Sequence, residues 1–193
     1  MQSKTAARIG AACGFVFPVA LSVGRSIGLP LGLAGLVLFV PFLAYICSLL
    51  RRVEGEDGWL TQAAFGAGLM GMTLKVMSGV PEIAYRGNPA GTQAHRALEG
   101  IANAATVVSL YPFAVFTAIV AVQALRREAL PRWLGAFAGV TAVALVVNGS
   151  LLHTGTVPAL LLFVVWSFVA GVTLFLRETV RGRVTSAAPA VAG

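Results

Sequence analysis

The chain has 193 residues, of which 58% are hydrophobic and only 11% are charged, and its formal net charge is +7. An ordinary soluble domain has about 25% charged residues, so this chain has too few polar side chains to cover a water-soluble globule. The composition argues against a soluble enzyme or a soluble nucleic-acid-binding domain. It predicts a single domain that has the bilayer as its solvent.

Six apolar runs reach the length of about 20 residues that a helix needs to cross a bilayer. In chain order, we predict spans at residues 6–24, 30–50, 59–83, 98–125, 133–152 and 157–176. Helices satisfy their own backbone hydrogen bonds, as lipid requires. The predicted fold class is therefore all-α, a polytopic six-helix transmembrane domain over residues 1–180, with a disordered cytoplasmic tail at 181–193.

The basic residues are distributed unevenly between the two ends of these spans. Most of them precede the first span or follow an even-numbered one: Lys4, Arg8, Arg51, Arg52, Arg126, Arg127, Arg132, Arg177, Arg181 and Arg183. The opposite loops hold only Arg25, Arg86 and Arg96. Because cytoplasmic loops carry the Lys/Arg excess, we predict that both termini are cytoplasmic. The positive charge then serves topology and membrane lipids, and no nucleic-acid partner is expected.

The first run resembles a signal peptide in its basic lead-in and apolar core. No small-x-small cleavage site follows, however, and Arg25 comes directly after the run. We therefore expect a retained first helix. Cys13 and Cys47 fall within the first two spans, where packed thiols are a better interpretation than a disulfide.

The third span carries small residues at helical spacing. Ala63, Ala67 and Gly71 recur every fourth residue, and Ala64 and Gly68 run alongside them. Small residues at this spacing let helices approach closely in lipid. The pattern predicts that the third helix lies centrally in the bundle, and it offers a contact for a homo- or hetero-oligomer.

Lys75, in the same span, is the most unusual residue of the sequence. A lysine at a helix centre costs about 2.5–3.5 kcal/mol. The Leu, Phe and Val residues around it offset about 2–3.5 kcal/mol at roughly 0.3–0.6 each, so the third helix is marginal alone. We expect its polar face to turn away from lipid.

Polar side chains on three spans are spaced to share one face of each helix. Gly71, Lys75, Ser78 and Glu82 form a stripe on the third span, Glu99, Asn103 and Thr106 form one on the fourth, and Thr141 and Asn148 align on the fifth. We predict that an outward-facing polar pocket is formed by these residues and the polar residues near them. The candidate catalytic residues are Glu82, Glu99 and Lys75, and the candidate ligand-binding residues are His95, Asn103, Asn148, His153 and Ser78.

Two interpretations of this pocket remain open. A carboxylate beside a desolvated lysine or a histidine can act as an acid or base near neutral pH, with Glu82 as the first candidate and Glu99 as the second. Alternatively, Lys75 and Glu82 form a structural ion pair, or the lysine stem extends to the interface. His95 and His153 lack a partner at metal-ligand spacing, so we expect no metal and no cofactor.

Two short motifs carry a resemblance to known proteins. The motifs are ARIG at Ala7 and LPRWLG at Leu130, and basic residues follow the second span. In these features the chain resembles an uncharacterised family of small bacterial polytopic membrane proteins. The resemblance implies the six-helix fold and its topology but no activity. We separately expect a location in the bacterial plasma membrane.

Three functions compete on these grounds. The first is a membrane-embedded enzyme or binder acting on a lipid or an isoprenoid-like amphipathic molecule, through acid/base chemistry such as cyclisation or isomerisation. The second is a non-catalytic partner or assembly subunit. The third is a small transporter. The cytoplasmic halves of the spans are almost entirely apolar, which argues against this function, because a transport pathway should be polar throughout or be built from broken helices.

Overall fold

The computed structural model describes residues 4–27, 35–55, 58–86, 89–127, 129–152 and 158–186, with side chains at 5–21, 35–55, 58–84, 89–127, 129–151 and 158–180. The described ranges contain helices and short connections and no strand. Their elements are α1 Lys4–Ile27, α3 Phe39–Glu54, α4 Trp59–Arg86, α5 Gln93–Arg127, α6 Arg132–Val147, the π-helical segment η1 Asn148–Leu152, and α7 Pro158–Ser186. The all-α prediction is confirmed.

The helix boundaries follow the predicted spans to within a few residues at most ends, and three of the differences are informative. α5 begins five residues earlier than predicted, because the Thr92 hydroxyl accepts a hydrogen bond from the backbone N–H of His95 at 3.2 Å and so caps the helix. The fifth span ends as η1 and not as an α-helix. α7 continues to Ser186, so residues 181–186, which the sequence analysis assigned to the tail, are helical. The rest of the tail, and the start of the second predicted span, lie outside the described residues.

The helices are long and apolar enough for a multi-pass membrane protein. Five described stretches meet the length and hydropathy of a membrane span: Gly35–Glu54, Trp59–Ala84, Gln93–Arg127, Arg132–Leu151 and Pro158–Val180. The described apolar part of α1, Thr5–Leu21, is shorter. The sixth crossing and the orientation in the membrane stay predictions.

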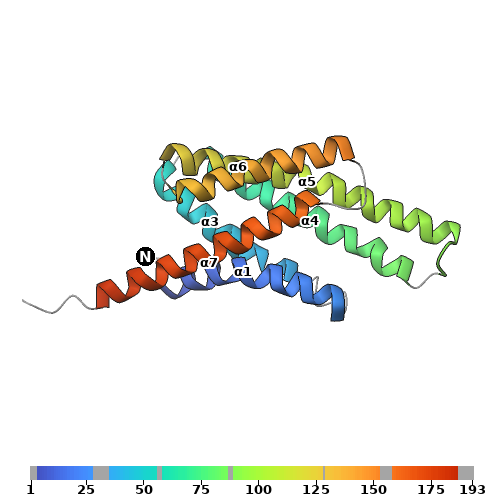
Figure 1. Cartoon of the computed structure of the whole chain (residues 1–193), viewed down its shortest axis with the longest axis horizontal. Coiled ribbons are helices and arrows are strands. Elements are labelled where there is room, and N and C mark those ends of the chain that lie inside the picture. Colours follow the sequence, from blue (N-terminus) through green and yellow to red (C-terminus); the bar gives the residue numbers. More distant parts are fainter. Residues whose placement is uncertain are drawn as a thin grey trace, which may run out of the picture.

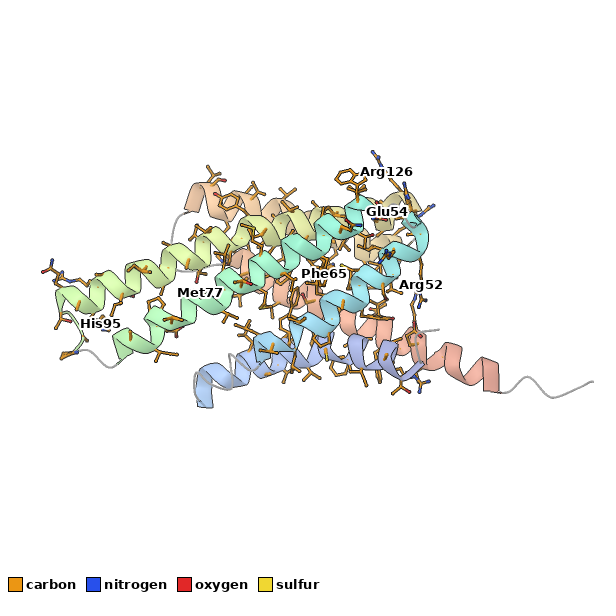
Figure 2. The ribbon with its side chains drawn as sticks, turned by 180° about the vertical axis from the view of Figure 1, so that it is seen from behind. Arg52, Glu54, Phe65, Met77, His95 and Arg126 are labelled. Carbon is orange, nitrogen blue, oxygen red and sulfur yellow. The ribbon has the colours of Figure 1, made fainter. Side chains whose placement is uncertain are left out.

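The helices run back and forth along one long direction (Figure 1). α5 packs between α4 and α6, α1 packs along α7, and α3 connects the two groups through α1, α4 and α5. The beginning of α1 and the end of α7 lie at the same end of the molecule. Figure 2 shows Arg52, Glu54 and Arg126 at that end and His95 at the opposite end. The arginine-rich end is therefore also the end where the described chain begins and finishes.

Glycines allow the closest helix contacts. A Cβ added at Gly171 of α7 would lie 2.6 Å from the backbone of Gly14 and Phe15 in α1. In α4, a Cβ at Gly68 would meet Leu43 of α3 at 2.5 Å, and a Cβ at Gly71 would meet Phe113 of α5 at 2.8 Å. The small residues noted in the sequence thus have partners within the chain.

α4 lies at the margin of the bundle and not at its centre, where the sequence analysis expected it. Its principal neighbours are α3 and α5 only. Met70 and Met77, on the face opposite Gly68, are 59% and 56% exposed, and Phe65 is 37% exposed. The small-residue pattern indicated close packing on one face but could not indicate that none of the described helices packs against the other face.

The middle of the bundle is filled by aromatic side chains. Phe39 contacts five other rings, with centroid distances between 5.3 and 6.1 Å, and Trp166 contacts three. The indole N–H of Trp166 donates to the Leu134 carbonyl oxygen of α6 at 3.3 Å. The cluster joins α1, α3, α5 and α7 and consists of Phe17, Phe39, Phe42, Phe113, Phe116, Phe163 and Trp166.

α5 is too long to be contained in a bilayer. Its 35 residues make a helix of about 52 Å, whereas the hydrocarbon core is about 30 Å thick. Figure 1 shows the paired ends of α4 and α5 extending past the neighbouring ends of α6 and α7. The α4–α5 hairpin therefore projects from the bundle at the end opposite the arginines.

Candidate functional site

Lys75 joins α4 to α5 through hydroxyl groups. Its ammonium group donates to the Thr106 hydroxyl oxygen of α5 at 2.9 Å and to the Ser78 hydroxyl oxygen at 3.3 Å. Ser78 in turn donates to the backbone carbonyl oxygen of Lys75 at 2.7 Å. Lys75 and Thr106 are half-buried and Ser78 is buried. The polar stripe of the third span thus turns toward α5, as expected from the cost of exposing it to lipid.

Glu82 and Glu99 lie further along the same helix pair. Glu82 follows Lys75 by seven residues on α4, and Glu99 precedes Thr106 by seven residues on α5. Because the helices are antiparallel, the backbone positions of Glu82 and Glu99 both lie about 10 Å beyond those of Lys75 and Thr106 toward the α4–α5 turn, on the same helix faces. Glu82 is half-buried and Glu99 is exposed.

Two more candidates continue this line on α5. Asn103 lies one turn from Thr106 and is exposed, and His95 lies in the first turn of the helix and is half-buried. Six of the eight candidate residues therefore lie along one helix pair. We call this line the α4–α5 polar seam, and it consists of Lys75, Ser78, Glu82, His95, Glu99, Asn103 and Thr106.

Asn148 lies apart from the seam, at the junction of α6 and α7. It is 2% exposed, and its side-chain oxygen accepts a hydrogen bond from the backbone N–H of Ala159 at 3.2 Å. The neighbouring Gly149 packs against the Tyr111 ring of α5. Tyr111 lies five residues deeper along α5 than Thr106, or about 7 Å. Asn148 thus caps α7, and the remaining candidate, His153, lies outside the described residues.

A second polar cluster, which the sequence analysis did not predict, lies at the arginine-rich end. The Glu54 carboxylate accepts hydrogen bonds from the backbone N–H groups of Leu60 and Thr61 at 3.0 and 2.9 Å. It also accepts from the Thr61 hydroxyl at 2.6 Å and from the Gln123 amide at 2.9 Å. Arg127 donates to the backbone carbonyl oxygens of Val53 and Glu54 at 3.4 Å. The carboxylate at the end of α3 therefore caps the start of α4 and binds α5.

Two signals in the sequence point to this cluster. Gln123 is a polar residue in an apolar helix, one turn before Arg126 and Arg127. Glu54 lies just before the start of a helix, where a carboxylate interacts favourably with the helix dipole. The contact between them spans 69 residues of chain, so neither signal alone identifies the partner.

The described residues do not form a candidate metal site. Among those residues, no three His, Cys, Asp or Glu side chains are grouped so as to hold a metal ion. Cys13 and Cys47 are both free and buried, which confirms the prediction of packed thiols.

The fold defines the class of this chain, which is a multi-pass membrane protein by the length and hydropathy of its helices. No protein-family model, curated protein or solved structure matches it. The class therefore rests on the molecule itself, and the resemblance noted in the sequence stays a prediction.

Proposed function

We propose that the chain binds an amphipathic small molecule, lipid-like or isoprenoid-like, at the inner end of the α4–α5 polar seam, where Lys75 lies. The hydrogen bond from Lys75 to Thr106 is the observation that carries this proposal. This bond holds the ammonium group of Lys75 between α4 and α5, close to the place where the α4–α5 hairpin extends beyond the other helices. An ammonium group in that position suits the polar headgroup of a molecule whose chain lies along the apolar bundle.

The depth of Lys75 supports this assignment. Thr61 and Gln123 both bind Glu54 and thus mark one depth at the arginine-rich end. Lys75 lies 14 residues beyond Thr61, and Thr106 lies 17 residues from Gln123, which is about 21–26 Å at 1.5 Å per residue. In a hydrocarbon core about 30 Å thick, the ammonium group lies just below the outer interface.

In a membrane of this thickness and orientation, the two carboxylates lie at the outer interface. Glu82 lies 21 residues beyond Thr61, or about 32 Å, which is at the outer limit of the hydrocarbon core. A ligand at this interface would meet the cation of Lys75 first and the acid Glu82 above it. For acid/base chemistry, Glu82 is the better candidate, because it is half-buried beside the helix pair whereas Glu99 is exposed to solvent.

A transport function fits the structure less well. Between the Glu54 cluster and the seam, the largest buried side chains of the described core are aromatic, and the buried Ser109 and Thr117 hydroxyls donate to backbone carbonyl oxygens of their own helix. A polar solute would need polar groups throughout the membrane thickness. The assembly-subunit alternative loses its main argument too, because Gly68 and Gly71 already pack against α3 and α5 of the same chain.

The proposed orientation has both termini in the cytoplasm and the α4–α5 hairpin outside. We expect a cysteine at exposed Gln93 to react with a membrane-impermeant maleimide in intact cells, and a cysteine at exposed Arg126 to react only after the membrane is opened. The native thiols Cys13 and Cys47 are buried and should stay unlabelled in both cases. The reverse labelling pattern would invert the proposed topology.

The ligand proposal predicts that Lys75→Met weakens binding of an anionic isoprenoid. Farnesyl phosphate and farnesol have the same isoprenoid chain but differ in charge. Comparing their affinities therefore distinguishes the contribution of the headgroup to binding from that of the chain. A hydrogen bond to a charged group contributes about 1.5–3 kcal/mol. Lys75→Met should therefore weaken the binding of farnesyl phosphate about 10- to 100-fold and leave the binding of farnesol nearly unchanged. Binding is measured by thermal stabilisation of the full-length protein in detergent.

Arg96→Gln is the matched control, since it removes a cation from the exposed surface of the same hairpin. It should leave both affinities within twofold. Equal affinity of wild type and Lys75→Met for farnesyl phosphate would overturn the assignment. For the enzymatic version of the proposal, Glu82→Gln should retain binding and the fold while turnover is lost.

A further inference from the structure

A groove of about 310 Å³ lies between α1 and α3 on the surface of the bundle. Its walls are mainly apolar and include Ala6 and Ile9 of α1 and Pro41, Ala44 and Tyr45 of α3. Small-molecule sites in proteins have volumes of about 300–1,000 Å³, so this groove accommodates part of an extended chain and not a whole lipid. It is separate from the polar seam, which lies between α4 and α5.

The groove is held in shape from behind. The Tyr45 hydroxyl donates to a carboxylate oxygen of Glu178 in α7 at 3.1 Å, which fixes the α3 wall. On the α1 side, a Cβ at Gly10 would lie 2.6 Å from the Tyr45 Cβ, so the two helices are in close contact at the base of the groove. The groove is thus already formed before any ligand enters.

The α3 wall leads directly to two arginines. Arg51 follows Ala44 by seven residues and Arg52 follows Tyr45 by seven, so they continue the same helix face about 10 Å further along. Both arginines are exposed, and Figure 2 shows Arg52 at the arginine-rich end of the bundle. An apolar groove that faces lipid therefore ends beneath a pair of cations.

We propose that this groove binds one acyl chain of an anionic phospholipid, with the headgroup phosphate against Arg51 and Arg52. The apolar walls match the hydrocarbon chain, and the arginines match the phosphate in charge and in hydrogen-bonding geometry. The lipid belongs to the leaflet at the arginine-rich end, where anionic headgroups attract basic side chains. This inference does not depend on the proposed ligand of the seam.

Native mass spectrometry of the full-length protein, with equal amounts of phosphatidylglycerol and phosphatidylcholine of the same chains, tests the proposal. Wild type should retain phosphatidylglycerol preferentially. Ala44→Phe fills the groove from an exposed position and should reduce retention of both lipids at least fivefold. The double variant Arg51→Gln with Arg52→Gln should lower the preference for phosphatidylglycerol about 30-fold, at about 1 kcal/mol for each arginine, while phosphatidylcholine retention is kept.

Two controls make the test specific. Ala136→Phe adds the same ring at an exposed alanine of α6, and Arg126→Gln with Arg132→Gln removes two exposed cations from another loop at the same end. Both should behave as wild type. Wild-type retention in Ala44→Phe, or an equal loss in Ala136→Phe, would overturn the groove as the site. An unchanged preference in the Arg51 and Arg52 variant would overturn the headgroup contact.

Discussion

Gly171→Ala should destabilise the protein by about 3 kcal/mol, the upper end of the usual range for overpacking. The added Cβ would lie 2.6 Å from the backbone carbon of Gly14 and the backbone nitrogen of Phe15. A flexible side chain could move aside from such a contact, but backbone atoms require α1 and α7 to separate. The free energy of unfolding in mixed detergent micelles, followed by circular dichroism, measures the effect.

Gly66→Ala provides the matched control for this prediction. Gly66 is also helical, but an added Cβ would have no neighbour within 4 Å. Alanine favours a helix over glycine by roughly 0.5–1 kcal/mol, so this variant should be as stable as wild type or slightly more stable. If Gly171→Ala were equally harmless, the close approach of α1 and α7 would be incorrect.

Glu54→Ala should lower the free energy of unfolding by about 2–4 kcal/mol, because it removes both a helix cap and the acceptor for buried hydrogen-bond donors. Four donors lose their partner: the backbone N–H groups of Leu60 and Thr61, the Thr61 hydroxyl and the Gln123 amide. Gln123 is 1% exposed, so water cannot easily replace the carboxylate there. The same unfolding assay measures the loss.

The conservative variant Glu54→Gln retains one side-chain oxygen and should have intermediate stability. Glu99→Ala removes an exposed carboxylate at the opposite end of the bundle and should change stability by less than about 0.5 kcal/mol. An unfolding free energy of Glu54→Ala within 0.5 kcal/mol of wild type would contradict the capping role of this residue.

Helix positions followed well from the sequence, because span length and hydropathy are local properties. The start of α4 at Trp59 was predicted at its observed residue. The start of α5 was missed by five residues, because the Thr92 cap is a single hydrogen bond in a polar stretch that hydropathy reads as a loop. The π-helical end of the fifth span at Asn148 was not predicted either; Gly149 in this segment lies against the Tyr111 ring of α5, a tertiary contact that hydropathy does not report.

The candidate site was predictable where it depends on one helix and its neighbour in sequence. The stripe through Lys75 and Ser78 faces Thr106 on the next helix, as periodicity and an antiparallel hairpin imply. The inclusion of Asn148 depended on how α6 packs against α5, which periodicity does not report. The Glu54 cluster was missed for the same reason, because Gln123 reaches it from a distant part of the chain.

The central claim is that Lys75 is kept for a ligand and not for the fold. Its direct test is the free energy of unfolding of Lys75→Met against wild type in detergent, without ligand. A lysine at the centre of a span costs about 2.5–3.5 kcal/mol of insertion free energy; Lys75 near the interface has part of that cost, and its hydrogen bonds to Thr106 and Ser78 act against it. We therefore predict that Lys75→Met is as stable as wild type or more stable. A loss of several kcal/mol in Lys75→Met, restored by adding Glu82→Gln, would contradict the claim and make the two residues a structural ion pair.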